Sequence, residues 1–393
     1  MKNLYDYLGL VAFGVKGGVV LPGDDIVEFV VEILNRCVKD NLISEGDVIC
    51  VTESVVARSQ NNFVSVEEIA ETLKKTLNLK KGSRVGVLFP ILSRNRFSSI
   101  LRGISRATEK GKVVLQLSFP SDEVGNRIIS EETLFHLGLG LDSYIKREEL
   151  KGVSLSHPIT GVDYLDYYEG NIKEEGAIPD IYLCNNPHQI ISCPLDALIV
   201  STIHKRNEDK AMFIKDFPKA ITLQEVFSNP TTPSWSEWGL LGSNLSAGEK
   251  IKLAPREASK VAERIQEKIK EKWGYSVEVI IYGDGAYKDP VTGIYELADP
   301  QPAFGLTQGL LNRWRLGVKY KYLADSLFSE GKSREEIGKC ITERRDILKC
   351  IPSNALEELG TTPRRSEDLI ASLADLVSGS ADAATPVVVV KGF

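Results

Sequence analysis

The sequence lacks several motifs that would assign a chemistry at once. Its four histidines stand far apart and form no HExxH pair, so the usual spacing of a catalytic zinc site is absent. There is no GxxxxGK[ST] phosphate loop and no GxGxxG turn after a strand. The GxSxG turn of many serine hydrolases is also missing. These absences leave acidic and small residues at the ends of strands as the candidates for chemistry.

Few features point to a membrane, to nucleic acid or to an oxidising compartment. The six cysteines show no CxxC spacing, which favours reduced thiols in a cytoplasmic protein. No apolar run approaches the roughly 20 residues needed to cross a bilayer, and the N-terminus does not resemble a signal peptide. The net charge is −6 with both signs interspersed, so we expect no nucleic-acid or membrane partner.

Length and patterning indicate a multidomain α+β (mixed α/β) protein. At about 100–200 residues per domain, 393 residues allow two or three domains. Short apolar runs rich in β-branched residues alternate with amphipathic stretches, which is typical of mixed sheets with flanking helices. The predicted strands are Asp47–Thr52, Arg84–Pro90, Lys112–Phe119, Asp196–Thr202, Val277–Tyr282 and Pro386–Lys391.

Helix ends are also marked in the sequence. Ser65 and Glu68 have the spacing of a capping box, in which each side chain bonds a backbone N–H at the start of a helix. From Pro255 to Trp273 the apolar residues fall on one helical face, and Gly274 is suited to end that helix. We therefore expect a long amphipathic helix directly before the strand Val277–Tyr282.

Two junctions near the N-terminus have the residue types that bind phosphate. Lys16–Asp25 is either a turn with an aspartate N-cap or a backbone cradle for a base or phosphate. Ser54 and Arg58 follow the strand Asp47–Thr52 and stand four residues apart. A hydroxyl and a guanidinium so placed can reach one phosphate together.

Two further junctions and one histidine segment complete the candidates. Asp284 lies between two glycines at the end of a strand, and is either a Mg²⁺ ligand or part of an ordinary Asp-Gly turn. The small residues Ser380–Thr385 join a helix to a strand, and either expose backbone N–H groups to an anion or form a plain connection. His157 and Asp163, in SHPITGVDY, are candidates for substrate contact.

Taken together, these segments resemble the coenzyme F420-0:L-glutamate ligase family of γ-glutamyl ligases. The best match is LADLVSGSADAATPVVVVKG near the C-terminus. GDDIVEFVVEIL with ISEGDVICVTESVVARSQ is next, followed by GSNLSAGEKIKLAP through the long helix to VEVIIYGDG. The resemblance covers roughly Phe13–Gln60, Gly239–Gly305 and Arg364–Gly392, and about Lys81–Trp238 looks like additional material.

The resemblance implies a two-subdomain fold with mixed sheets, a homodimer, GTP as energy source, and Mg²⁺ or Mn²⁺. It divides the chain into residues 1–80 and 239–393, which form the ligase core, and residues 81–238, an insertion that we expect to recognise the acceptor. A domain boundary is predicted within Ser228–Asn244, which is rich in Pro, Ser, Thr and Asn.

Site residues follow from the same resemblance. It places the nucleotide on Gly17, Gly18, Val19, Val20, Ser54, Arg58, Asn244, Gly379, Ser380, Ala381 and Asp382. Arg58 stands where the family has Lys, and Leu241 stands where the family has a metal-binding Asp. Either the metal site is rebuilt from Asp284, Asp289 or Glu296, or catalysis is altered. Arg58 and Asp284 are the predicted catalytic residues.

The implied function is a GTP-dependent γ-glutamyl ligase. It would join L-glutamate to a carboxylate of a small-molecule acceptor, the deazaflavin precursor of coenzyme F420, through an acyl-phosphate. A folate or another carboxylate is the alternative acceptor, because residues 81–238 can reshape the acceptor pocket. A non-catalytic nucleotide-binding regulatory protein is the second alternative, which Leu241 keeps open.

Overall fold

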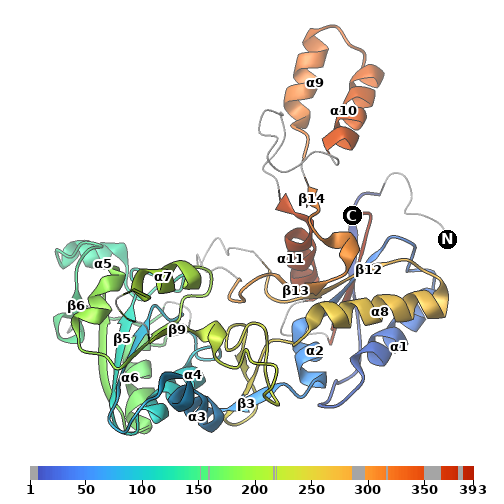
Figure 1. Cartoon of the computed structure of the whole chain (residues 1–393). Coiled ribbons are helices and arrows are strands. Elements are labelled where there is room, and N and C mark those ends of the chain that lie inside the picture. The colour runs from blue at the N-terminus through green and yellow to red at the C-terminus, as the bar shows by residue number, and fades with distance from the viewer. Residues whose placement is uncertain are drawn as a thin grey trace.

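Two sheets with flanking helices dominate the structure, and each belongs to its own lobe (Figure 1). The computed structural model describes residues 8–150, 152–157, 160–215, 217, 219–285, 297–315, 317–348, 364–378 and 384–393. It confirms the predicted α+β fold with mixed sheets.

The first sheet brings the two ends of the chain and its centre side by side. Its strand order is β1-β16-β2-β12-β13, in which β2 and β12 are parallel and the other neighbours are antiparallel. The strands are β1 (Val11–Val15), β2 (Val48–Thr52), β12 (Glu278–Tyr282), β13 (Ala303–Leu306) and β16 (Val387–Lys391). Loops that are distant in sequence therefore share one edge of this sheet.

Helices cover both faces of the first sheet. Side chains alternate along each strand, so Val51 packs with α1 (Ile26–Lys39) and α8 (Ala258–Trp273), whereas its neighbour Cys50 packs against α11 (Ser366–Ser378). Burial on both faces explains why the inner positions of β2, β12 and β16 are apolar. The polar residues begin where the buried strands end, in the loops that follow them.

The second sheet lies entirely within residues 84–222. Its order is β6-β7-β5-β4-β8-β9, with β6 antiparallel and the other strands parallel. The strands are β4 (Arg84–Leu88), β5 (Lys112–Leu117), β6 (Ile145–Lys146), β7 (Ile178–Leu183), β8 (Ala197–Val200) and β9 (Ala220–Thr222). The order reverses between β4 and β8, and open sheets of this kind bind ligands beyond the carboxyl ends of the strands at such a point.

Helices also cover this sheet on both faces. The larger core contains α3 (Val66–Leu77), α4 (Ser98–Ala107) and α6 (Tyr164–Glu174), and α7 (Arg206–Phe213) buries Phe213 on the opposite face. The short helix α5 (Glu131–His136) adds Leu134 to the larger core. The result is a doubly covered sheet in the left-hand lobe of Figure 1.

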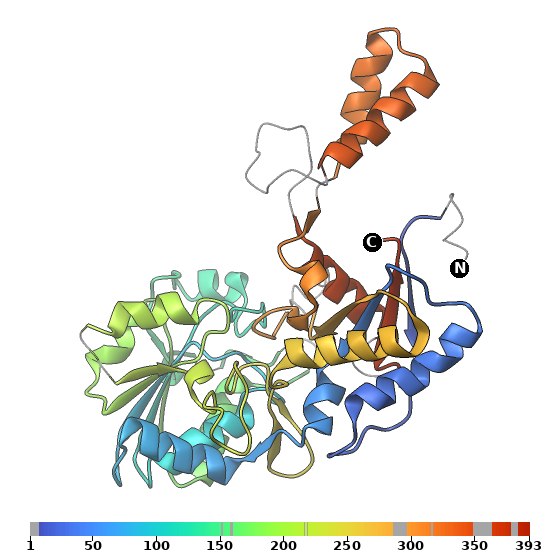
Figure 2. The same cartoon turned by 45° about the vertical axis from the view of Figure 1, so that its right-hand side comes forward.

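Smaller elements connect the lobes or project from them. A three-stranded sheet is formed by β3 (Phe63–Ser65), β10 (Asn244–Leu245) and β11 (Lys250–Lys252), and a two-stranded one by β14 (Trp314–Arg315) and β15 (Arg364–Arg365). Short 3₁₀ helices span Arg147–Leu150, Pro187–Ser192, Leu223–Glu225 and Gln308–Leu310. The helices α9 (Tyr320–Ser329) and α10 (Arg334–Leu348) stand away from both lobes as a hairpin (Figures 1 and 2).

All six predicted strands are confirmed within two residues at either end. The capping box of Ser65 and Glu68 is present at α3. One helix differs from the prediction: α8 begins at Ala258, whereas the sequence predicted a helix from Pro255. The reason is a long-range contact: the side-chain amide of Gln60 bonds both backbone groups of Arg256, and this holds the preceding segment outside the helix.

Candidate functional site

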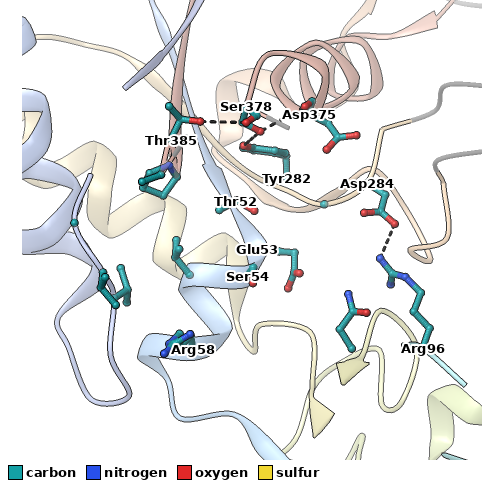
Figure 3. A pocket seen from close by; sticks show the side chains of 18 residues that line it. Thr52, Glu53, Ser54, Arg58, Arg96, Tyr282, Asp284, Asp375, Ser378 and Thr385 are labelled. Atoms are coloured by element: carbon teal, nitrogen blue, oxygen red, sulfur yellow. Dashed lines mark hydrogen bonds and ion pairs between the residues drawn. The ribbon is translucent and has the colours of Figure 1, made fainter. Parts of the chain in front are cut away.

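A cavity of about 480 Å³ opens beyond the carboxyl ends of β2 and β12 (Figure 3). Segments from the two ends and the centre of the chain line it. The lining residues are Gly18, Val19, Val20, Thr52, Glu53, Ser54, Val55, Arg58, Arg96, Asn244, Tyr282, Gly283, Asp284, Asp375, Ser378, Ala384, Thr385 and Pro386. The parallel pairing of β2 with β12 brings the two central loops together, because parallel strands end at the same edge.

Ser54 and Arg58 face this cavity from α2 (Glu53–Ser59), which starts directly after β2. Residues four apart lie on one face of a helix, so the hydroxyl and the guanidinium open on the same space. Both residues are exposed, and the Arg58 side chain has no ion pair among the described residues. An unpaired guanidinium at a cavity wall is suited to an anionic ligand.

The N-terminal segment forms another part of the wall. Gly18, Val19 and Val20 line the cavity, whereas Gly17 donates its backbone N–H to the carbonyl of Ala384 at 2.7 Å. That bond ties the start of the chain to the segment before β16. Of the predicted nucleotide segment, three residues therefore face the cavity and Gly17 anchors it.

The C-terminal wall is held by hydrogen bonds around Ser378. The Tyr282 hydroxyl donates to Ser378 Oγ at 2.8 Å, and Thr385 Oγ1 donates to the Ser378 carbonyl at 3.2 Å. Asp375 accepts the Gly285 backbone N–H at 2.9 Å, and burial raises the pKa of this carboxyl group. The predicted residues Gly379, Ser380, Ala381 and Asp382 lie outside the described residues.

Glu53 forms a buried ion pair at the back of the cavity. Lys252 Nζ lies 2.8 Å from Glu53 Oε1 and 2.7 Å from Oε2, and both side chains are 9% exposed. Burial raises the pKa of Glu53, and the Lys252 charge opposes this shift. Neither residue was predicted from the sequence, although Glu53 follows the predicted strand Asp47–Thr52 directly.

Arg96 joins the two lobes through two carboxylates. Its Nη2 lies 2.6 Å from Asp284 Oδ2, and its Nη1 lies 2.6 Å from Asp299 Oδ1. Asp299 also accepts the backbone N–H of Asp284 at 2.9 Å. Burial raises the pKa of Asp284, and the neighbouring Asp299 raises it further while Arg96 opposes the shift. Figure 3 shows the side chains of Asp284 and Arg96 pointing toward one another.

Only one of the three predicted metal ligands lies in the described part of the chain. Asp284 already binds the Arg96 guanidinium, and Asp289 and Glu296 lie outside the described residues. In the described part of the chain, no group of three or more His, Cys, Asp or Glu side chains is placed to hold a metal ion. Leu241, where the resemblance implies a metal-binding Asp, is buried in the larger hydrophobic core. Among the described residues, Asp284 is therefore paired with an arginine, and the metal site stays a prediction.

A second cavity of about 380 Å³ adjoins the first. It lies beyond the carboxyl end of β4, close to the reversal in strand order of the second sheet. Its lining residues are Ile91, Leu92, Ser93, Arg94, Asn95, Arg96, Val124, Asn126, Thr160, Tyr164, Asn244, Asp284 and Ala298. Arg96, Asn244 and Asp284 line both cavities, so these three residues form the boundary between them.

His157 and Asp163 are not among the lining residues of either cavity. His157 is buried, and its Nδ1 accepts the Thr160 backbone N–H at 3.2 Å. Asp163 caps α6 and lies 3.2 Å from Arg147. Thr160 and Tyr164 of the same segment line the second cavity, so the segment predicted to contact substrate reaches a cavity wall through two other residues.

Arg96 and Asp299 are the most important site residues that the sequence analysis missed. A weak signal existed for Arg96, because it follows the predicted strand Arg84–Pro90 in a polar SRNR segment. Asp299 has no such signal, since nothing in its local sequence relates it to an arginine 203 residues away.

Comparison with known proteins supplies the family. The family model described as F420-0:Gamma-glutamyl ligase matches residues 14–392. A coenzyme F420:L-glutamate ligase from Methanothermobacter thermautotrophicus (strain Delta H) is 36% identical over 63 residues, which is 16% of this chain and 24% of that ligase's own length.

One solved structure is also similar in part, the tetrameric eIF2B-beta2-delta2 complex from C. thermophilum. The similarity covers 62% of this chain and 67% of the matched chain in that complex, at 11% identity and a TM-score of 0.24.

In the described part of the chain, no helix is both long and apolar enough to span a membrane.

Proposed function

The chain belongs to the F420-0:gamma-glutamyl ligase family, and from this premise we propose that it joins L-glutamate to a carboxylate of a small-molecule acceptor at the expense of GTP. The acceptor that the family name suggests is F420-0, the deazaflavin precursor. One observation carries the proposal: two adjoining cavities share Arg96, Asn244 and Asp284 as their boundary. A phosphoryl donor in one and a carboxylate in the other would meet there.

The nucleotide belongs in the first cavity. Ser54 and the unpaired Arg58 guanidinium would bind phosphate oxygens, and the backbone of residues 18–20 would contact the nucleoside. Arg58 is suited to this because its planar guanidinium bonds phosphate through two N–H groups at once. The segment 379–382 remains a predicted nucleotide contact.

The acceptor belongs in the second cavity, whose volume is within the range of small-molecule sites. Exposed Arg94 has no ion pair among the described residues, and it would attract an acidic acceptor. The acceptor's carboxylate would then approach Arg96 and Asn244 at the boundary.

The reaction has two steps. A carboxylate oxygen of the acceptor bonds to the γ-phosphorus while the bond to the β,γ-bridging oxygen breaks, which gives an acyl-phosphate and GDP. The α-amine of L-glutamate then attacks the acyl carbon, phosphate leaves, and the nitrogen gives up a proton to form the amide. Charge builds on the phosphoryl oxygens in the first step, and cationic groups held in place stabilise it. The fold supplies Arg58 and Arg96; Mg²⁺ or Mn²⁺ stays a prediction.

The test is a direct assay. The purified protein is incubated with GTP, Mg²⁺, L-glutamate and F420-0, and mass spectrometry follows the mass of one added glutamyl residue while phosphate release is measured. Product with stoichiometric phosphate supports the proposal; neither product nor phosphate overturns it. Arg58→Ala should lose most activity, whereas Arg264→Ala, an exposed arginine on α8, is the matched control.

A different acceptor is the first alternative, because the second cavity is built largely by residues 91–164. A panel that contains a folate and other carboxylates, assayed in the same way, separates these acceptors. Product from a folate and none from F420-0 would favour this alternative.

A non-catalytic nucleotide-binding protein is the second alternative, and buried Leu241 is the observation in its favour. Calorimetry that gives the same affinity for GTP in the presence and absence of Mg²⁺, together with the absence of product from every acceptor, would favour it.

The family resemblance also leads us to propose a homodimer, which light scattering would detect as twice the chain mass of 43.4 kDa.

A further inference from the structure

We propose that the Arg96 side chain takes the place of a divalent metal ion in this site. Its guanidinium lies between Asp284 and Asp299, where a bound metal ion was expected. The proposal has two parts. The first, that arginine and not metal neutralises these carboxylates before nucleotide binds, concerns the free protein alone. The second, that Arg96 then faces the transferred phosphoryl group, rests on the proposed function.

The geometry supports the first part. Two different nitrogens of one guanidinium each lie 2.6 Å from a carboxylate oxygen, one on Asp284 and one on Asp299. The Asp284 backbone N–H also bonds Asp299, so the two acidic groups are held next to each other. Hydrogen bonds between charged partners at such distances are among the strongest that proteins form.

Burial makes a cation necessary at this place. The Asp299 side chain is 1% exposed, Asp284 is 24% exposed and Arg96 is 14% exposed. Two adjacent carboxylates with so little water cannot both stay ionised at low cost unless a cation lies between them. Arg96 supplies that charge, and a metal ion could enter only by displacing the guanidinium.

The position of Leu241 is an independent observation. The resemblance places a metal-binding Asp there, but Leu241 is 3% exposed and packs in the larger core. No replacement set of three ligands exists within the described ranges. The chain has thus lost an expected metal ligand and, in the same region, has an arginine bound to two carboxylates.

Arg96 is also placed to act on the substrate. It lines both cavities, at their boundary. A guanidinium has five N–H donors, and two are used by Asp284 and Asp299, so the others have no partner among the described residues. As the acceptor oxygen bonds to the γ-phosphorus and the bridging oxygen leaves, these donors would stabilise charge on the phosphoryl oxygens without any proton or electron transfer.

The test measures Mn²⁺ binding by electron paramagnetic resonance, without nucleotide or substrate. The wild-type protein should show no stoichiometric Mn²⁺ site. Arg96→Gln should gain such a site, with an affinity for Mn²⁺ roughly tenfold or more above that of the wild type, since the two carboxylates become available as hard oxygen ligands. Arg96→Gln combined with Asp299→Asn should lose that gain.

Arg96→Lys is the matched control. It keeps the charge but presents one nitrogen in place of a planar fork, so it should not gain the Mn²⁺ site, and its activity in the ligase assay should fall. Thermal melting checks that each variant is folded.

Stoichiometric Mn²⁺ binding by the wild type that Asp284→Asn abolishes would overturn the proposal, and this result needs no Arg96 variant to fold. Equal, weak Mn²⁺ binding by wild type and a folded Arg96→Gln variant would also overturn it. If the variants bind Mn²⁺ as expected but the ligase assay gives no product, the proposed function is rejected and the assignment of Arg96 as the cation is retained.

Discussion

The ion pair between Glu53 and Lys252 predicts a large loss of stability when only one partner is removed. Both nitrogen–oxygen distances are below 3 Å, at 2.8 and 2.7 Å, and both side chains are 9% exposed. Lys252→Met keeps the length of the side chain and removes its charge. It leaves the Glu53 carboxylate buried beside the cavity without its cation, which for such pairs costs about 3–5 kcal/mol of the free energy of unfolding.

Two comparisons separate this effect from a general cost of mutation. Lys74 pairs with Glu71 at 2.8 Å and with Glu109 at 2.9 Å, but these partners' side chains are 50% and 46% exposed, so Lys74→Met should cost only about 0–1 kcal/mol. Adding Glu53→Gln to Lys252→Met removes the orphaned charge and should restore most of the lost stability.

The pH dependence gives a further check. Burial raises the pKa of Glu53 above its ordinary value of 4.5, and Lys252 opposes the rise. A carboxyl group with a raised pKa in the folded state stabilises the fold at low pH, and this contribution is lost as pH rises through the folded pKa. Without Lys252 the folded pKa rises further, so the deficit of Lys252→Met should be larger at pH 8 than at pH 5.

The assay is urea unfolding at both pH values, followed by tryptophan fluorescence and circular dichroism. The reasoning is refuted if Lys252→Met loses no more stability than Lys74→Met, or if the double variant is as unstable as Lys252→Met alone. A deficit that is smaller at pH 8 than at pH 5 would contradict the assigned direction of the Glu53 shift.

Three other predictions test the fold and the site. Arg58→Ala should weaken GTP binding by roughly tenfold or more in calorimetry, because a charge-assisted contact to phosphate is lost; unchanged affinity would remove Arg58 from the nucleotide site. Burial raises the pKa of Asp122 to about 6, so stability should fall as pH rises from 4 to 6, and Asp122→Asn should flatten that dependence in urea titrations. Gly239→Ala should lower the melting temperature far more than Gly23→Ala, since both have positive φ but only at Gly239 would the new Cβ lie 2.2 Å from a backbone oxygen; equal losses would argue against that close packing.

The local part of the fold was predictable because its signals are local. The strand Val277–Tyr282 is apolar apart from Glu278, and the structure places β12 there with helices on both faces. Asp25 caps α1 and accepts the backbone N–H groups of Val27 and Glu28, as the GDD sequence before an apolar helix suggests. Periodicity and capping depend on neighbours within about one helical turn, so one sequence is sufficient to find them.

The charge pairs of the site were not predictable in the same way. Arg96 and Asp299 are 203 residues apart, and Glu53 and Lys252 are 199 apart. Such partners are brought together by the tertiary structure, and no periodic pattern in the sequence records them. The candidates that did reach the cavity, such as Ser54 and Asn244, were found from the family resemblance or from their place after a strand.

Long-range packing also determines the surroundings of two residues in the expected metal site, Leu241 and Asp284. At position 241 the resemblance implied a carboxylate, but the side chain is apolar and lies in the larger hydrophobic core. Asp284 was recognised from its position between two glycines, whereas its partner Arg96 comes from the other lobe. A pattern can indicate a carboxylate at a strand end, but the neighbouring cation is determined by the tertiary structure.

The central claim is that both ends and the centre of the chain form one triphosphate site. Its most direct test is a crystal structure of the protein with a non-hydrolysable GTP analogue. The account predicts the triphosphate in the larger cavity, with Arg58 and Arg96 within hydrogen-bonding distance of phosphate oxygens. A nucleotide bound elsewhere, or bound with both guanidinium groups remote from its phosphates, would contradict it.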